Sequence, residues 1–174
     1  MQWTDDAIVL SARPHGESSV VLQLLTRGHG RHAGLVRGGQ SARARGLYQP
    51  GNRVEATWNA RLAEHLGLYR CELTGSHAAT LLDRPDRLLA LSAAAAVSER
   101  ALPEREPHPA CFEGLLALLE ALESEHWAEV YVRWELLLLA ELGFALELER
   151  CAAGGDADDL VYVSLLYTSP SPRD

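Results

Sequence analysis

The chain has 174 residues, of which 47% are apolar and 23% charged, and its formal net charge is −8. This composition is typical of a globular protein, and no apolar run reaches the roughly 18 residues that a membrane-spanning helix requires. The N-terminus lacks the basic region and cleavage site of a signal peptide, so we expect a cytoplasmic protein without membrane contact.

The basic and cysteine residues exclude further classes. All sixteen basic residues are arginine, which excludes a Schiff-base lysine and the lysine of a phosphate-binding loop. The three cysteines, Cys71, Cys111 and Cys151, are far apart and odd in number, as expected for reduced thiols.

The first 76 residues read as short strands separated by turns that contain glycine or proline. The strand-like runs are AIVLSAR, SVVLQLLT, HAGLVRG, NRVEATWNA and LGLYRCELTG. In VEATWN, apolar and polar residues alternate, which places Val54, Ala56 and Trp58 on one buried face. Five short strands are too few for a sandwich and fit a five-stranded OB-fold barrel, which we assign to residues 1–78.

Charge is unevenly distributed between the two parts of the chain. Residues 1–80 contain nine arginines against six acidic residues, whereas residues 81–174 contain seven arginines against eighteen. The segment from Arg27 to Arg53 holds six arginines and seven glycines and has no acidic residue. Such a split favours two domains that meet different partners.

The remainder reads as an α-helical domain at 79–164, so the predicted fold class is α+β. A helix is expected from Pro85 to about Arg100, then a break at PEREPHP, then two apolar stripes at 112–122 and 127–142. Gly143 would cap the last helix, which is apolar around so much of its circumference that we expect it to be central.

The C-terminal residues do not complete an element. LVYVS at 160–164 reads as the beginning of a strand, and LLYTSPSPRD follows it. We therefore treat residues 165–174 as a non-native tail and the helical domain as incomplete. On this basis we expect the barrel to be self-contained and residues 81–164 to expose apolar surface.

No arrangement of residues indicates an enzyme, a cofactor or a metal site. GHGRHAG has its glycines spaced wrongly for a dinucleotide loop and joins two strands. Cys151 belongs to no paired-cysteine motif, and His29 and His32 have no further ligand at a recognisable spacing, so we interpret both as solvated loop histidines. Asp5 and Asp6 are interpreted as the solvated start of a strand.

The basic segment is the strongest functional feature. Arginine provides forked donors to phosphate oxygens, and OB-fold barrels commonly bind single strands through a basic groove with aromatic stacking platforms. Tyr48 lies inside the segment and is the candidate platform, whereas the alternation around Trp58 places that ring in the core. The candidate DNA-binding residues are Arg27, Arg31, Arg37, Arg43, Arg45, Tyr48 and Arg53.

The order of segments along the chain resembles the RecO family of bacterial DNA repair and recombination proteins. The stretches that carry the resemblance are WTDDAIVLSARPHGE, LLTRGHGRHAGLVRGG, LYQPGNRVEATWNARL, EHLG, ERALPEREPHP, FEGLLALLEAL and RWELLLLAELGFALELERCA. Known members have an N-terminal OB-fold followed by a helical domain. Some members carry a four-cysteine zinc module after the last helix, where this sequence has Cys151 alone.

The resemblance implies a non-enzymatic mediator. Members bind single- and double-stranded DNA, anneal complementary strands and associate with RecR. They also engage the single-stranded-DNA-binding protein and help to load RecA, which is thus an indirect partner. The alternative is an OB-fold adaptor whose basic loop binds an acidic protein rather than DNA.

Overall fold

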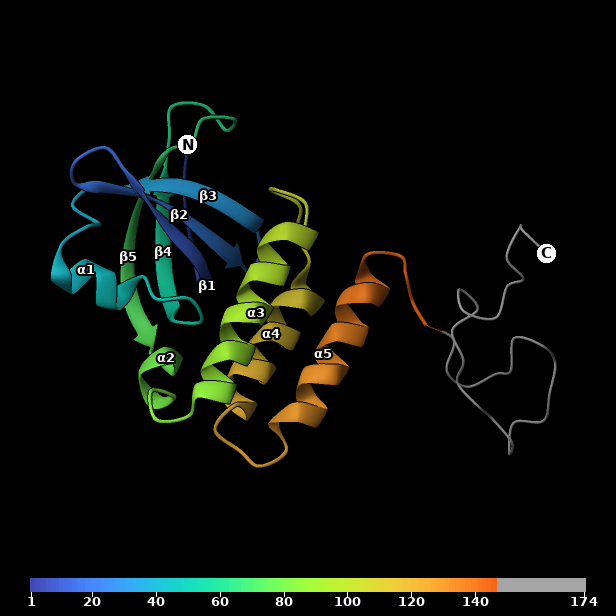
Figure 1. Cartoon of the computed structure of the whole chain (residues 1–174). Helices are drawn as coiled ribbons and strands as arrows, with labels where there is room; N and C mark the ends of the chain where they lie inside the picture. The colour runs from blue at the N-terminus through green and yellow to red at the C-terminus, as the bar shows by residue number, and fades with distance from the viewer. Residues whose placement is uncertain (147–174) are drawn as a thin grey trace, which may run out of the picture.

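The computed structural model describes residues 1–146, and the chain in this range forms a β-barrel followed by a layer of helices (Figure 1). The strands are β1 (Gln2–His15), β2 (Ser19–Thr26), β3 (Gly30–Val36), β4 (Arg53–Asn59) and β5 (Leu68–Gly75). They close in the order β1-β2-β3-β5-β4. This arrangement confirms the predicted OB-fold followed by helices and the α+β fold class.

The extent of strand pairing differs around the barrel. β1 is long, has a register shift between Val9 and Ser11, and pairs antiparallel with both β2 and β4. β3 and β5 instead run parallel and share the single pair Leu35–Leu68. Beyond that pair the two strands separate, which leaves a hollow in the barrel wall.

The interior of the barrel is filled by the alternating residues that the sequence predicted. Val54, Ala56 and Trp58 of β4 are at most 2% exposed, as their two-residue period indicated. The Trp58 indole donates to the Leu66 carbonyl oxygen at 3.0 Å, so its one polar group is satisfied inside the barrel.

A short helix, α1 (Ala42–Leu47), lies between β3 and β4, where the sequence predicted a loop. Ser41 caps it by accepting a hydrogen bond from the Ala44 amide at 3.3 Å. The helix has only six residues, and none of them is buried. A segment this short, without a buried apolar face, shows no helical period in the sequence. Tyr48, which follows it, packs into the barrel core.

The helical layer matches its sequence pattern closely. It consists of α2 (His77–Thr80), α3 (Pro85–Ala101), α4 (Pro109–Ala121) and α5 (Trp127–Glu141). Pro85 and Pro109 each stand at the first position of a helix, where a missing amide hydrogen costs nothing. Gly143 follows α5 with a positive φ of 85°, as expected of a helix-terminating glycine.

The helices pack on the outer face of the barrel, and the barrel interior is a separate apolar cluster. Ile8, Leu10 and Leu25 point outward from β1 and β2 and belong to the same buried cluster as Leu91 and Phe112 of the helices. The barrel has an interior core of its own, but removing the helices would expose the outer face of these two strands, so the expectation of a self-contained barrel stays a prediction.

The linker between α3 and α4 is fastened to the start of β3. The Arg105 amide donates to the Arg31 carbonyl oxygen at 2.7 Å, and the Arg31 guanidinium donates to the Leu102 carbonyl oxygen at 2.8 Å. Gly30 has a φ of 68°, and a Cβ on it would collide with the Glu106 backbone. A glycine is required here because a second backbone passes directly over it.

The position of α5 differs from the prediction. It lies at the edge of the helical layer (Figure 1) and buries Trp134 and Leu138 against α4. Val132 is 54% exposed and Leu139 is 38% exposed, so α5 is not central within residues 1–146. The strand start at 160–164 and the tail at 165–174 lie outside the described residues, as does the rest of the helical domain after residue 146.

Among residues 1–146, no helix combines the length and the apolar composition that crossing a bilayer would require.

We predict that the barrel and helices unfold in one transition, because the core of the helical layer includes Ile8, Leu10 and Leu25 of the barrel. Leu25 is fully buried in that shared core, so Leu25→Ala should lower the free energy of unfolding by about 2–5 kcal/mol. Urea denaturation followed by tryptophan fluorescence and by far-ultraviolet circular dichroism should give coincident curves, shifted together. Leu82→Ala, at a side chain that is 74% exposed, is the control and should change stability by less than about 0.5 kcal/mol. Two separate transitions would contradict the shared core.

Candidate nucleic-acid interface

The six arginines of the basic segment fall into two groups by their surroundings. Arg37 follows β3, and Arg43 and Arg45 lie on α1; all three are exposed. Arg27, Arg31 and Arg53 are half-buried at the other side of the barrel. In Figure 1, α1 lies on the side of the barrel away from α4 and α5. The two groups therefore face different surroundings.

Asp6 binds two arginines of the second group. Its carboxylate accepts from Arg53 at 2.8 and 2.6 Å, a forked pair, and from Arg27 at 3.2 Å. Burial by itself would raise the pKa of Asp6, but the hydrogen bonds and charges of Arg53 and Arg27 outweigh it and lower the pKa below 3.8. Asp6 is thus a structural acid.

Asp5 is also engaged, so the interpretation of Asp5 and Asp6 as a solvated strand start is wrong. Its carboxylate accepts from the Gly28 amide at 2.7 Å and lies 3.0 Å from Nδ1 of His29. It thereby holds the turn between β2 and β3. Asp5 and Asp6, which bind residues of the basic segment, thus lie outside that segment in the sequence.

Arg27 joins the barrel to α4. It pairs with Glu113, and its guanidinium lies 4.6 Å from the centre of the Phe112 ring. Arg31 is held by the Leu102 carbonyl, as described above. These interactions use the donors of Arg27, Arg31 and Arg53 within the protein, which does not support a primary DNA-binding role for them. Direct binding of DNA by these three arginines stays a prediction.

Two exposed arginines, Arg37 and Arg70, line a groove where β3 and β5 separate. We call this the arginine groove. It has a volume of about 550 Å³ and is lined by Val36, Arg37, Tyr48, Thr57, Asn59, Leu68, Tyr69, Arg70 and Cys71. Within residues 1–146, Arg37 and Arg70 have no salt-bridge partner, whereas Arg27 and Arg53 do. The groove thus combines free positive charge with hydroxyl and amide groups.

A second hollow adjoins the arginine groove at Tyr48. It has a volume of about 510 Å³ and includes Gln40, Arg45, Gln49 and Pro50 among its lining residues. Arg43 is also exposed on α1, two residues before Arg45. Arg37, Arg45 and Arg70 thus line two neighbouring hollows whose polar groups can bind phosphate and sugar.

Tyr48 has a different role from the one predicted. It is 8% exposed and belongs to the barrel core, and burial raises the pKa of its hydroxyl to about 12. The structure does not support a stacking platform here, because so little of the ring is open. Tyr48 instead lines both hollows and belongs to the core cluster against which Ala44 and Leu47 of α1 pack.

Arg70 lines the arginine groove but was not among the candidate residues of the sequence analysis. It lies in β5 opposite Thr57 of β4, outside the segment Arg27–Arg53. A signal was present, since buried Tyr69 and exposed Arg70 alternate along the strand. Further along the same face, Glu55 lies opposite Glu72 and marks the end of the positive region.

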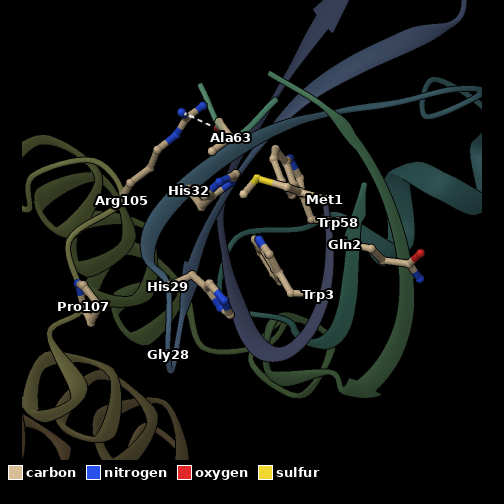
Figure 2. Close-up of a pocket in the computed structure, with 10 residues that line it drawn as sticks. All are labelled: Met1, Gln2, Trp3, Gly28, His29, His32, Trp58, Ala63, Arg105 and Pro107. Atoms are coloured by element: carbon tan, nitrogen blue, oxygen red, sulfur yellow. Dashed lines mark hydrogen bonds between the residues drawn. The ribbon is translucent and has the colours of Figure 1, made fainter. Parts of the chain in front are cut away.

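A third cavity lies at the other end of the barrel and is aromatic (Figure 2). It has a volume of about 530 Å³, and its lining includes Trp3, His29, His32 and Trp58. The Trp3 ring stacks on His29 at 4.1 Å and on Trp58 at 5.7 Å. Trp3 therefore packs against two of the protein's own rings and is only half-buried in this cavity.

His32 corrects a further prediction, because it is a buried strand residue. It is 4% exposed, and its Nδ1 lies 2.9 Å from the Tyr69 hydroxyl. Burial, with a smaller contribution from the charge of Arg105, lowers its pKa to about 4, so the ring is neutral at pH 7. His29 is half-buried between Asp5 and Trp3, so neither histidine is a solvated loop residue.

Comparison with known proteins agrees with this architecture. The model described as "Recombination protein O N terminal" matches residues 1–77, and "Recombination protein O C terminal" matches residues 82–171. The chain belongs to the RecO family. The two RecO regions correspond to the barrel and to the helical part.

The curated relatives extend beyond this chain. A protein of Rhodospirillum centenum named DNA repair protein RecO is 62% identical over 166 residues, which cover 94% of this chain and 66% of the relative. Proteins of the same name from Rhodospirillum rubrum and Nitrobacter hamburgensis are 51% and 50% identical and are covered over 68% and 65% of their lengths. The chain thus spans about two thirds of the length of these RecO relatives.

We predict that Asp6→Asn destabilises the fold by about 1–3 kcal/mol at pH 7, because it removes the charge and one of the two acceptor oxygens that bind Arg53 and Arg27. The pKa of Asp6 is lower in the folded chain than in the unfolded one. The pairing therefore stabilises fully above about pH 5 and is lost as the pH falls through the folded pKa. Urea denaturation of both proteins at pH 7 and pH 3 should show a difference that shrinks at the lower pH. An undiminished difference at pH 3 would contradict the assignment.

Proposed function

We propose that this RecO chain binds DNA through the arginine groove and the adjoining surface of α1, and that it acts in DNA repair and recombination. The observation that carries the proposal is that Arg37, Arg70 and Arg45 line two adjoining hollows, with exposed Arg43 on the same helix as Arg45, and that none of the four has a salt bridge within residues 1–146. The names of the relatives, DNA repair protein RecO, support the same role.

Binding would act mainly on the sugar–phosphate backbone. Guanidinium groups donate forked hydrogen bonds to phosphate oxygens, and Thr57 and Asn59 line the groove between the cations. The aromatic rings nearby, Tyr48 and Tyr69, are 8% and 5% exposed, so stacking would contribute little. We therefore expect weak sequence preference and a strong dependence on salt concentration.

The same charges support the annealing of complementary strands as part of the proposal. Two DNA strands repel each other, and a surface that neutralises phosphates lowers that repulsion while the bases pair. Arg37 directly after β3 and Arg70 on β5 both line the groove, so cations reach it from two strands. Annealing requires no bond to be made or broken, so we propose a non-enzymatic mediator that leaves the length of a labelled strand unchanged.

The helical layer would serve protein partners. Its exposed residues include Glu123, Glu125, Glu129 and Glu135. Acidic side chains repel phosphates, so DNA would be confined to the opposite side of the barrel. We include association with RecR and with the single-stranded-DNA-binding protein, and help in loading RecA, in the proposal on the ground of family membership.

We predict that Arg37→Ala, Arg43→Ala and Arg45→Ala together weaken binding to all single-stranded oligonucleotides about equally. For every phosphate that is no longer neutralised, the dependence of log affinity on log salt concentration should fall by about 0.7, so the triple change should flatten it by roughly 2. Fluorescence anisotropy with a labelled oligonucleotide at several salt concentrations measures both quantities.

The matched control for this experiment removes three arginines from the helical layer: Arg84, Arg100 and Arg133. It changes the net charge equally and should leave the salt dependence almost unaltered. Equal losses in both triple variants would show that affinity follows net charge rather than this surface. If the wild-type chain fails to bind DNA even at low salt, the adaptor with an acidic protein partner is favoured instead.

A further inference from the structure

Three side chains with metal-binding atoms converge between α4 and α5, far from the arginine groove. His108 immediately precedes α4, Cys111 lies in its first turn, and Glu141 is the last residue of α5. A spacing of three residues places His108 and Cys111 on the same side of the helix start. α4 and α5 run side by side in opposite directions, so the end of α5 reaches this point (Figure 1).

The donor atoms are already close together. One potential ligand atom from each of the three residues lies within 4.8 Å of the others, and His108 Nδ1 lies 3.8 Å from Glu141 Oε2. Tetrahedral zinc, with bonds of 2.0–2.3 Å, holds its ligand atoms roughly 3.2–3.8 Å apart. Small rotations of the Glu141 and Cys111 side chains would bring the three atoms to that spacing.

His108 and Glu141 face each other without a hydrogen bond. The separation of 3.8 Å between His108 Nδ1 and Glu141 Oε2 is too long for one, so both atoms are available to an ion. Cys111 is 2% exposed, whereas the Glu141 side chain is 34% exposed, so the cluster opens to solvent on one side. Solvent could supply both the ion and a fourth ligand.

We propose that His108, Cys111 and Glu141 bind a zinc ion, with water in the fourth position. Imidazole, thiolate and carboxylate together suit zinc, whereas magnesium and calcium prefer oxygen ligands. On binding, the Cys111 thiol releases its proton to solvent. This site differs from the sequence expectation of no metal, which rested on the absence of paired cysteines.

The ion would fasten the open end of the α4–α5 pair. Within the described chain, α5 buries Trp134 and Leu138, and Gly114 of α4 allows Leu137 to approach closely. These contacts hold the middle of the pair. A metal that binds to the start of α4 and the end of α5 would fix α5 in register, and binding to the folded state alone would raise its stability.

The test uses the whole chain after treatment with a chelator and titration with Co²⁺, which reports thiolate ligation by a charge-transfer band in the near ultraviolet. We expect one Co²⁺ per chain, displaced by Zn²⁺, and a higher Tm with Zn²⁺. Cys111→Ser should lose the charge-transfer band. Glu141→Gln, at a half-exposed position that should not disturb folding, should weaken Co²⁺ binding by at least roughly tenfold while retaining the band.

Cys71→Ser is the matched control, because Cys71 lies in β5 of the barrel. It should leave the band and the affinity unchanged. The proposal is overturned if the wild-type chain binds no Co²⁺ stoichiometrically. It is also overturned if the band persists in Cys111→Ser or if Glu141→Gln binds as tightly as the wild type.

Discussion

The packing of α3 and α4 against the outer face of β1 and β2 determines which side of the barrel remains open. Ile8, Leu10 and Leu25 are buried beneath those helices, so this face is unavailable to a ligand. The linker between the helices is also fastened over the start of β3 by Arg31. What remains accessible is the side that carries α1 and the gap between β3 and β5. The acidic helical layer and the free arginines are therefore placed on opposite sides.

The same docking determines which arginines are available. Arg27 and Arg53 lie near the helices and share the carboxylate of Asp6, so their charges stabilise the fold. Arg37 lies beyond that contact and has no salt-bridge partner in the described chain. A count of arginines in the segment overestimates the charge that is open to a ligand, because Arg27, Arg31 and Arg53 bind groups within the protein. Arg70, on another strand, adds one exposed charge.

The sequence predicts those elements whose periods are strong. The alternation around Trp58 identified an inward strand face, and the apolar stripes with their prolines and glycine identified α3, α4 and α5. The sequence could not reveal that Asp6 meets Arg53, because the two are 47 residues apart and become neighbours through strand pairing. The short helix α1 has too few apolar residues to show a helical period. Arg70 lies near Arg37 in the folded chain but outside the segment Arg27–Arg53 in the sequence. The edge position of α5 depends on tertiary packing, which its own apolar residues do not specify.

Arginine side-chain NMR provides the most direct test of the account, since each Nε–H group gives its own resonance. The chain has sixteen arginines, so individual assignment by substitution is practicable. During titration with a single-stranded oligonucleotide, the resonances of Arg37, Arg43, Arg45 and Arg70 should shift, while that of Arg53 should stay in place on Asp6. The account would be contradicted if Arg53 shifted with the DNA and the four exposed arginines did not respond.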